Sequence, residues 1–76
     1  MKTLIVGLGI QGKKRQSSLR KKEFICSVDP YSKKAKYKYI EEVPSNLYDT
    51  VFICTPDKEK IKVIEHCIKN KKNCLI

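Results

Sequence analysis

The stretch that decides the fold is Met1-Lys-Thr-Leu-Ile-Val-Gly7-Leu-Gly9-Ile-Gln-Gly12, at the start of the chain. Its apolar run Thr3–Val6 predicts a strand that leads directly into Gly-x-Gly-x-x-Gly at the start of a predicted helix. In this context the pattern is typical of a dinucleotide-binding turn, although glycines also mark turns that bind no ligand. Gly7 would permit the tight turn, Gly9 the approach of a pyrophosphate, and Gly12 the close packing of helix on strand.

The next predicted strand, Glu23–Val28, ends at Asp29, close to the ~20 residues expected between the glycines and an acidic residue. A carboxylate there can accept hydrogen bonds from ribose hydroxyls and would repel a 2′-phosphate, which favours NAD over NADP. The nearby Ser32, Lys33 and Lys34 could offset that repulsion, so NADP stays open. The competing role for Asp29 is a helix N-cap with Pro30 at the first helical position. The candidate cofactor contacts of these two segments are Gly7, Gly9, Ile10, Gln11, Gly12 and Asp29.

The remaining chain predicts further strands and helices. The helix after Gly9 should run to about Lys21, with a thin apolar stripe formed chiefly by Ile10 and Leu19. Tyrosines and lysines interleave over residues 31–39; this pattern can stack on nucleic-acid bases, but a short helix and an edge strand at 37–40 explain it without a ligand. Residues 41–48 predict a loop or a single helical turn.

Thr50–Cys54 predicts another buried strand, after which Thr55 supplies a capping hydroxyl and Pro56 lies in the first turn of a helix. That helix should stop at Asn70, and Asn73–Ile76 begins a further strand. The order of elements predicts an α/β fold: a Rossmann-type parallel sheet with helices on both faces. Seventy-six residues are too few for both mononucleotide-binding halves. We therefore expect residues 1–76 to be an incomplete, truncated N-terminal dinucleotide-binding domain whose substrate domain is absent.

Composition narrows the function classes. The formal charge is +9, from 17 Lys and Arg against 8 Asp and Glu, and the basic residues are spread along the chain, which favours a lysine-rich surface over a nucleic-acid partner. The four cysteines lack metal-ligand spacing and are expected as buried thiols in a reducing cytoplasm. No run approaches the ~20 apolar residues of a membrane span, and no signal peptide is indicated. We expect no metal, no membrane contact and a cytoplasmic location, and we leave a homo-oligomer open.

Three marks together resemble the N-terminal part of the glucose–fructose oxidoreductase / inositol dehydrogenase / MocA family. They are Gly7-Leu-Gly-Ile-Gln-Gly12, Val28-Asp29-Pro30, and Tyr48-Asp-Thr-Val-Phe-Ile-Cys-Thr-Pro56 before a helix. The resemblance covers essentially the whole chain and implies that Thr55 and Pro56 contact the cofactor. Two positions where that family often carries histidine hold Arg15 and Lys60 here. The family's Glu-Lys-Pro motif would follow Ile76, so the resemblance implies cofactor binding without the catalytic lysine.

The leading hypothesis is therefore the NAD(P)-binding part of an oxidoreductase. The parent enzyme would transfer hydride between nicotinamide and a hydroxyl-bearing substrate, and the resemblance implies a sugar or cyclitol. The small-molecule substrate would bind only in the longer parent, and we assign no catalytic residue here; the lone His66 is expected to be structural. The alternative is a non-catalytic dinucleotide-sensing regulatory module. Nucleic-acid binding is a third hypothesis, for which no recognisable motif is present.

Overall fold

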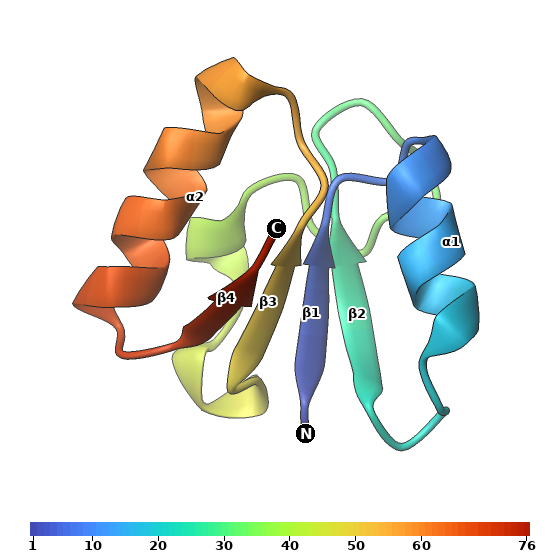
Figure 1. Cartoon of the computed structure of the whole chain (residues 1–76), viewed down its shortest axis with the longest axis horizontal. Helices are drawn as coiled ribbons and strands as arrows, with labels where there is room; N and C mark the ends of the chain where they lie inside the picture. The colour runs from blue at the N-terminus through green and yellow to red at the C-terminus, as the bar shows by residue number, and fades with distance from the viewer.

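The computed structural model describes all residues from Met1 to Ile76 and contains a four-stranded, all-parallel sheet with two α-helices (Figure 1). The strands lie in the order β2-β1-β3-β4. The predicted α/β class and parallel sheet are confirmed. The elements are β1 (Thr3–Val6), α1 (Ile10–Ser18), β2 (Phe24–Val28), β3 (Thr50–Ile53), α2 (Asp57–Lys69) and β4 (Asn73–Leu75).

Strand β1 lies in the middle of the sheet because its four residues are apolar or β-branched and are all buried. Its neighbours are β2 on one side and β3 on the other. The backbone pairing continues beyond the strand ends: the Gly7 N–H donates to Val28 O at 2.7 Å, and the Cys54 N–H to Val6 O at 2.8 Å. The chain order thus reverses at β1, so the carboxyl ends of β1, β2 and β3 form the kind of switch point where open α/β sheets bind ligands.

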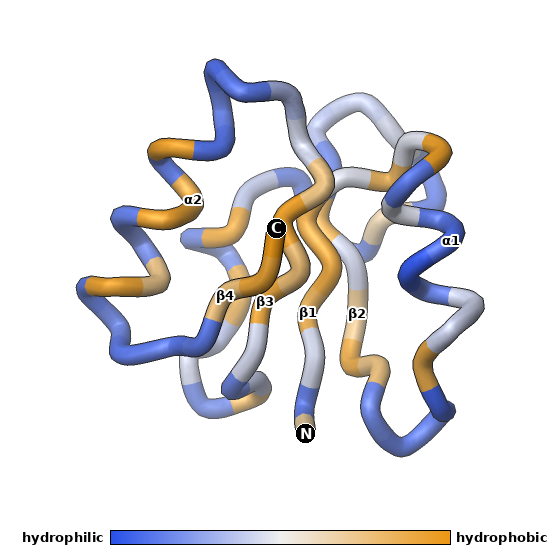
Figure 2. The backbone as a smooth tube through the Cα atoms, in the orientation of Figure 1, coloured by the Kyte–Doolittle hydropathy of each residue, from blue (hydrophilic) through white to orange (hydrophobic).

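The apolar core forms between the sheet and α2. Leu4 and Val6 of β1 belong to a cluster of 11 buried residues that also includes Val63 and Cys67 of α2. No residue of α1 belongs to this cluster. Figure 2 shows the corresponding difference between a largely hydrophilic α1 and an α2 that carries regular apolar positions.

Helix α1 differs from expectation in two respects. It ends at Ser18 rather than near Lys21, and the Ser17 and Ser18 hydroxyls donate back to the carbonyls of Lys14 and Arg15 at 2.9 and 2.8 Å. Such back-bonding favours helix termini over helix interiors. The predicted stripe is also partly wrong, since Ile10 is 76% exposed. The one buried residue of α1 is Gly12, so the helix packs through its backbone rather than through side chains.

The segment between β2 and β3 contains no α-helix, and Tyr37 forms a single parallel bridge with Val28 instead of an edge strand over 37–40. The Glu42 carboxylate explains the difference, because it accepts hydrogen bonds from the N–H groups of Lys38 and Tyr39, both at 2.9 Å. These bonds close a 3₁₀ turn at Ile40–Glu42 and withdraw the preceding residues from the sheet. A second 3₁₀ turn covers Ser45–Leu47, within the predicted loop.

The prediction that the Thr55 hydroxyl caps the start of α2 is wrong. The helix begins at Asp57 after Pro56, and the Thr55 hydroxyl makes no capping hydrogen bond. Its first turn holds Asp57 and Glu59, which complement the positive end of the helix dipole. The stop at Asn70 is confirmed: its N–H and its side-chain amide both donate to His66 O. Neither helix of the chain has the length and apolar composition to cross a membrane.

Candidate functional site

Two of the three glycines are required by the fold itself. Gly7 adopts a φ of +102°, a conformation that side chains rarely tolerate, and a Cβ there would lie 2.7 Å from Cys54 O. At Gly12 a Cβ would lie 1.8 Å from Gly7 O, because the first turn of α1 packs directly on the loop. These contacts agree with the turn and packing roles predicted for Gly7 and Gly12.

Gly9 is different. A Cβ built on Gly9 meets nothing within 4 Å, and its φ of −73° and ψ of −162° suit any residue. Neither strain nor crowding therefore requires glycine at this position. The structure leaves open space beside the Gly9 backbone.

The start of α1 offers unpaired donors next to that space. The first N–H groups of a helix have no partner within the helix, and no side chain caps α1. The N–H groups of Ile10 and Gln11 donate to no backbone or side-chain acceptor. The first turn contains no acidic residue, so the positive end of the helix dipole is not neutralised by the chain.

Asp29 ties the end of β2 to the glycine loop. Its Oδ2 accepts a hydrogen bond from the Leu8 N–H at 2.8 Å, and its Oδ1 accepts one from the Tyr31 N–H at 2.8 Å. No helix follows, so the alternative role as a helix N-cap is wrong; the local bond to Tyr31 instead forms an Asx turn. A carboxylate has about four lone-pair sites, so both oxygens keep the capacity to accept further hydrogen bonds.

A cavity of about 390 Å³ lies at the carboxyl ends of β1, β2 and β3. It brings together five of the eight predicted site residues: Gly7, Gly9, Asp29, Thr55 and Pro56. A neighbouring cavity of about 240 Å³ is lined by Gln11 and also by Thr55. Ile10 and Gly12 line neither cavity.

The cavity is also lined by residues that were not predicted to contact a cofactor: Pro30, Tyr31, Cys54 and Glu59. The position of Tyr31, two residues after Asp29, is a sequence signal that could have identified it as a site residue. Its side chain is 86% exposed. Glu59 reaches the cavity only because α2 starts beside the glycine loop, which a linear reading of the chain does not reveal.

Thr55 occupies the centre of this region. It lines both cavities and a third one of about 240 Å³, which has Val6, Val28 and Val63 among its walls. Its Oγ1 is buried and has no hydrogen-bond partner. Leaving a buried hydroxyl unpaired costs about 1–3 kcal/mol.

Positive charge gathers on the Gln11 side of the site. Arg15 and Lys60 line the same cavity as Gln11. The Arg15 guanidinium lies 5.6 Å from the centre of the Phe52 ring, and Lys60 Nζ lies 3.4 Å from Asp57 Oδ1. Burial raises the pKa of the Cys54 thiol, while Arg15 and Lys60 act to lower it. Cys54 is therefore a neutral wall of the site near pH 7.

His66 lies outside all of these cavities. Its Nε2 is 3.3 Å from the hydroxyl of Tyr48, which is 2% exposed and whose pKa is raised by burial. Lys72 Nζ sits 4.6 Å above the same Tyr48 ring and donates to Tyr48 O at 2.7 Å. This arrangement fits the structural role expected for His66.

The residues of the site contain no metal centre: no group of three or more His, Cys, Asp or Glu side chains is placed to hold an ion. Comparisons with protein-family models, curated proteins and solved structures returned no match. The function of the chain is therefore inferred from the geometry of the glycine loop and its neighbours.

Proposed function

We propose that the chain binds a nicotinamide dinucleotide, NAD in preference to NADP, across the carboxyl ends of β1, β2 and β3. The observation that carries this proposal is Gly9: the fold needs Gly7 and Gly12 to be glycine, but it makes no such demand at Gly9. A glycine that the fold does not require, beside open space, suits the close approach of a pyrophosphate to the backbone.

The phosphates would meet the start of α1. The N–H groups of Ile10 and Gln11 have no protein partner, and helix N-termini favour anions through these donors and through the dipole. Arg15 and Lys60 would add positive charge on the Gln11 side.

The adenosine ribose would lie against Asp29. Its carboxylate is already oriented by the N–H groups of Leu8 and Tyr31, so it can accept hydrogen bonds from ribose hydroxyls without losing further side-chain entropy. A 2′-phosphate would meet this negative charge, which supports NAD. Lys33 and Lys34 in the following loop would offset part of this repulsion, so NADP binding stays open.

We further propose that the sheet is covered on both faces, as in an incomplete doubly wound domain. Leu4 and Val6 share the core cluster with Val63 of α2, whereas the intervening Ile5 is the side chain nearest to Gly12 of α1. Alternate residues of a strand point to opposite faces, which supports α1 and α2 lying on opposite sides of the sheet.

Within a longer parent enzyme, this part would position the nicotinamide for hydride transfer to or from a hydroxyl-bearing carbon, while the cofactor supplies the reaction itself. The chain assigns no side chain of its own to proton transfer, since His66 is held by Tyr48 outside the cavities. A dinucleotide-sensing module would use the same contacts. Cofactor binding is common to the oxidoreductase and to the sensing module. Only the oxidoreductase would turn over a substrate, so an activity assay of the parent protein distinguishes them.

Calorimetric titration with NADH tests the proposal. Gly9→Val places a branched side chain in the open space, so we expect it to weaken NADH binding by about tenfold or more, since hydrogen bonds to charged groups are worth about 1.5–3 kcal/mol each. Lys69→Val, at an exposed position of α2, is the matched control and should bind like the wild type. Unchanged NADH affinity in folded Gly9→Val would refute the assigned site.

A further inference from the structure

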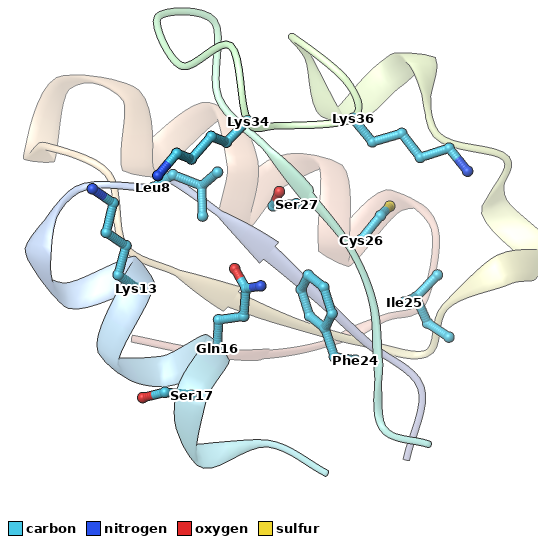
Figure 3. A pocket seen from close by; sticks show the side chains of 10 residues that line it. All are labelled: Leu8, Lys13, Gln16, Ser17, Phe24, Ile25, Cys26, Ser27, Lys34 and Lys36. Carbon is cyan, nitrogen blue, oxygen red and sulfur yellow. The ribbon is translucent and has the colours of Figure 1, made fainter. Parts of the chain in front are cut away.

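A fourth hollow, of about 530 Å³, lies beside β2, and none of Gly9, Asp29 and Thr55 lines it. Its walls come from β2, from α1 and from the loop that follows Asp29 (Figure 3). Three of its ten lining residues are lysines, Lys13, Lys34 and Lys36, and none is acidic. In Figure 3 the ammonium groups of Lys13 and Lys34 lie toward the Leu8 end and that of Lys36 toward the Ile25 end. We call this hollow the β2 groove.

The β2 groove contains an open edge of the sheet. Strand β2 is one of the two edge strands of the sheet, and its only outer partner is Tyr37, which forms a single bridge with Val28. Ser27 O accepts the Tyr37 N–H at 3.3 Å, so the backbone groups of Ser27 point outward. No strand pairs with this edge over Phe24–Cys26, and all three of these residues line the groove. An unpaired edge of this kind is a template for an added strand.

We propose that the β2 groove binds an extended acidic peptide segment, which pairs with the outer edge of β2 and places its carboxylates near Lys13, Lys34 and Lys36. Peptides that add to a sheet edge gain affinity from main-chain hydrogen bonds and specificity from alternate side chains. The three unpaired residues Phe24–Cys26 span about 10 Å, which corresponds to three residues of the added strand.

Charge and shape favour this partner over a nucleic acid. The lysines supply complementary charge for any anion, but the free backbone edge is matched only by another polypeptide backbone. Single-stranded nucleic acids bind by stacking on exposed aromatic rings. The most exposed tyrosines, Tyr31 at 86% and Tyr39 at 57%, lie outside the groove, and its one aromatic residue, Phe24, is half-buried.

The test is fluorescence anisotropy with a labelled octapeptide of alternating aspartate and valine at physiological salt. We expect saturable binding, lost when alternate peptide nitrogens are methylated, because methylation removes the donors that pair with a sheet edge. A lysine–valine octapeptide should not bind. The double variant Lys34→Glu with Lys36→Glu should weaken binding by about tenfold or more, since two attractive charge pairs become repulsive.

The matched control is Lys58→Glu with Lys69→Glu, which makes the same change in net charge at exposed positions of α2. The peptide affinity of this control should stay within about threefold of that of the wild type, because charges beyond a Debye length of about 8 Å are screened. Equal losses in both double variants would overturn the proposal by showing a general charge effect. Retained binding of the N-methylated peptide would overturn the strand pairing. If the peptide does not bind but a single-stranded oligonucleotide does, and the Lys34 and Lys36 substitutions weaken oligonucleotide binding, the partner of the groove is a nucleic acid and the peptide proposal is overturned.

Discussion

Substituting alanine at the glycines should separate what the fold needs from what a ligand needs. At Gly12 the new Cβ would lie 1.8 Å from Gly7 O, whereas real Cβ contacts are essentially never below 3.0 Å, so α1 must move by more than 1 Å. Overpacking of this kind costs about 1–3 kcal/mol and occasionally more. A domain of 76 residues has a free energy of unfolding of about 4–11 kcal/mol, so Gly12→Ala removes a large fraction of it.

Gly9→Ala should behave differently. Its Cβ meets nothing within 4 Å, so the gain of about 0.4–1 kcal/mol from replacing glycine at a compatible backbone position is set only against the poorer capping by alanine at the N-cap of α1. Urea unfolding followed by far-UV circular dichroism measures both variants. With an m-value of about 1 kcal/mol/M, Gly12→Ala should lower the midpoint by about 2 M or unfold the chain outright. Gly9→Ala should shift the midpoint by less than about 1 M, because its two effects on stability nearly cancel. Equal losses for the two variants, or an unchanged midpoint for Gly12→Ala, would refute this reasoning.

Three further outcomes are expected. Asp29→Ala should weaken NADH while sparing NADPH, as measured by calorimetry, and Asp29→Asn, which keeps an acceptor for the Leu8 N–H, shows how much of the loss comes from the loop. Burial raises the pKa of Cys67 from 9.0 to about 11, so only the unfolded state ionises between these values. The free energy of unfolding should therefore fall as pH rises from 9 to 11, and less steeply in Cys67→Ala. The 76-residue chain should oxidise no sugar or polyol with NAD or NADP; steady NADH formation above that of identically purified Gly9→Val would contradict this.

The sequence predicted the sheet well because its signals are local. Three continuous apolar runs, each followed by glycine, aspartate or threonine at its end, became β1, β2 and β3 with nearly the expected bounds. Parallel pairing then places the ends of these strands together, which is why Gly9, Asp29 and Thr55 line one cavity. The positions of Gly9, Asp29 and Thr55 at the ends of predicted strands were therefore enough to predict that these residues lie close together.

The errors occurred where distant side chains override local preference. Glu42 captures the N–H groups of Lys38 and Tyr39, and an edge strand that the composition favours is reduced to one bridge. Asp29 reaches back 21 residues to Leu8 instead of capping a helix. Neither contact follows from periodicity, since both depend on how the chain has already folded.

Amide chemical-shift mapping of the folded chain during titration with NADH tests dinucleotide binding at the glycine loop most directly. Binding at the proposed site predicts the largest shifts at Gly9, Ile10 and Gln11, with further shifts at Tyr31 and Thr55 around the Asp29 side of the cavity. Ser27, in the β2 groove, should change little. The absence of saturable shifts at Gly9, Ile10 and Gln11, or shifts confined to other parts of the chain, would contradict the proposed function.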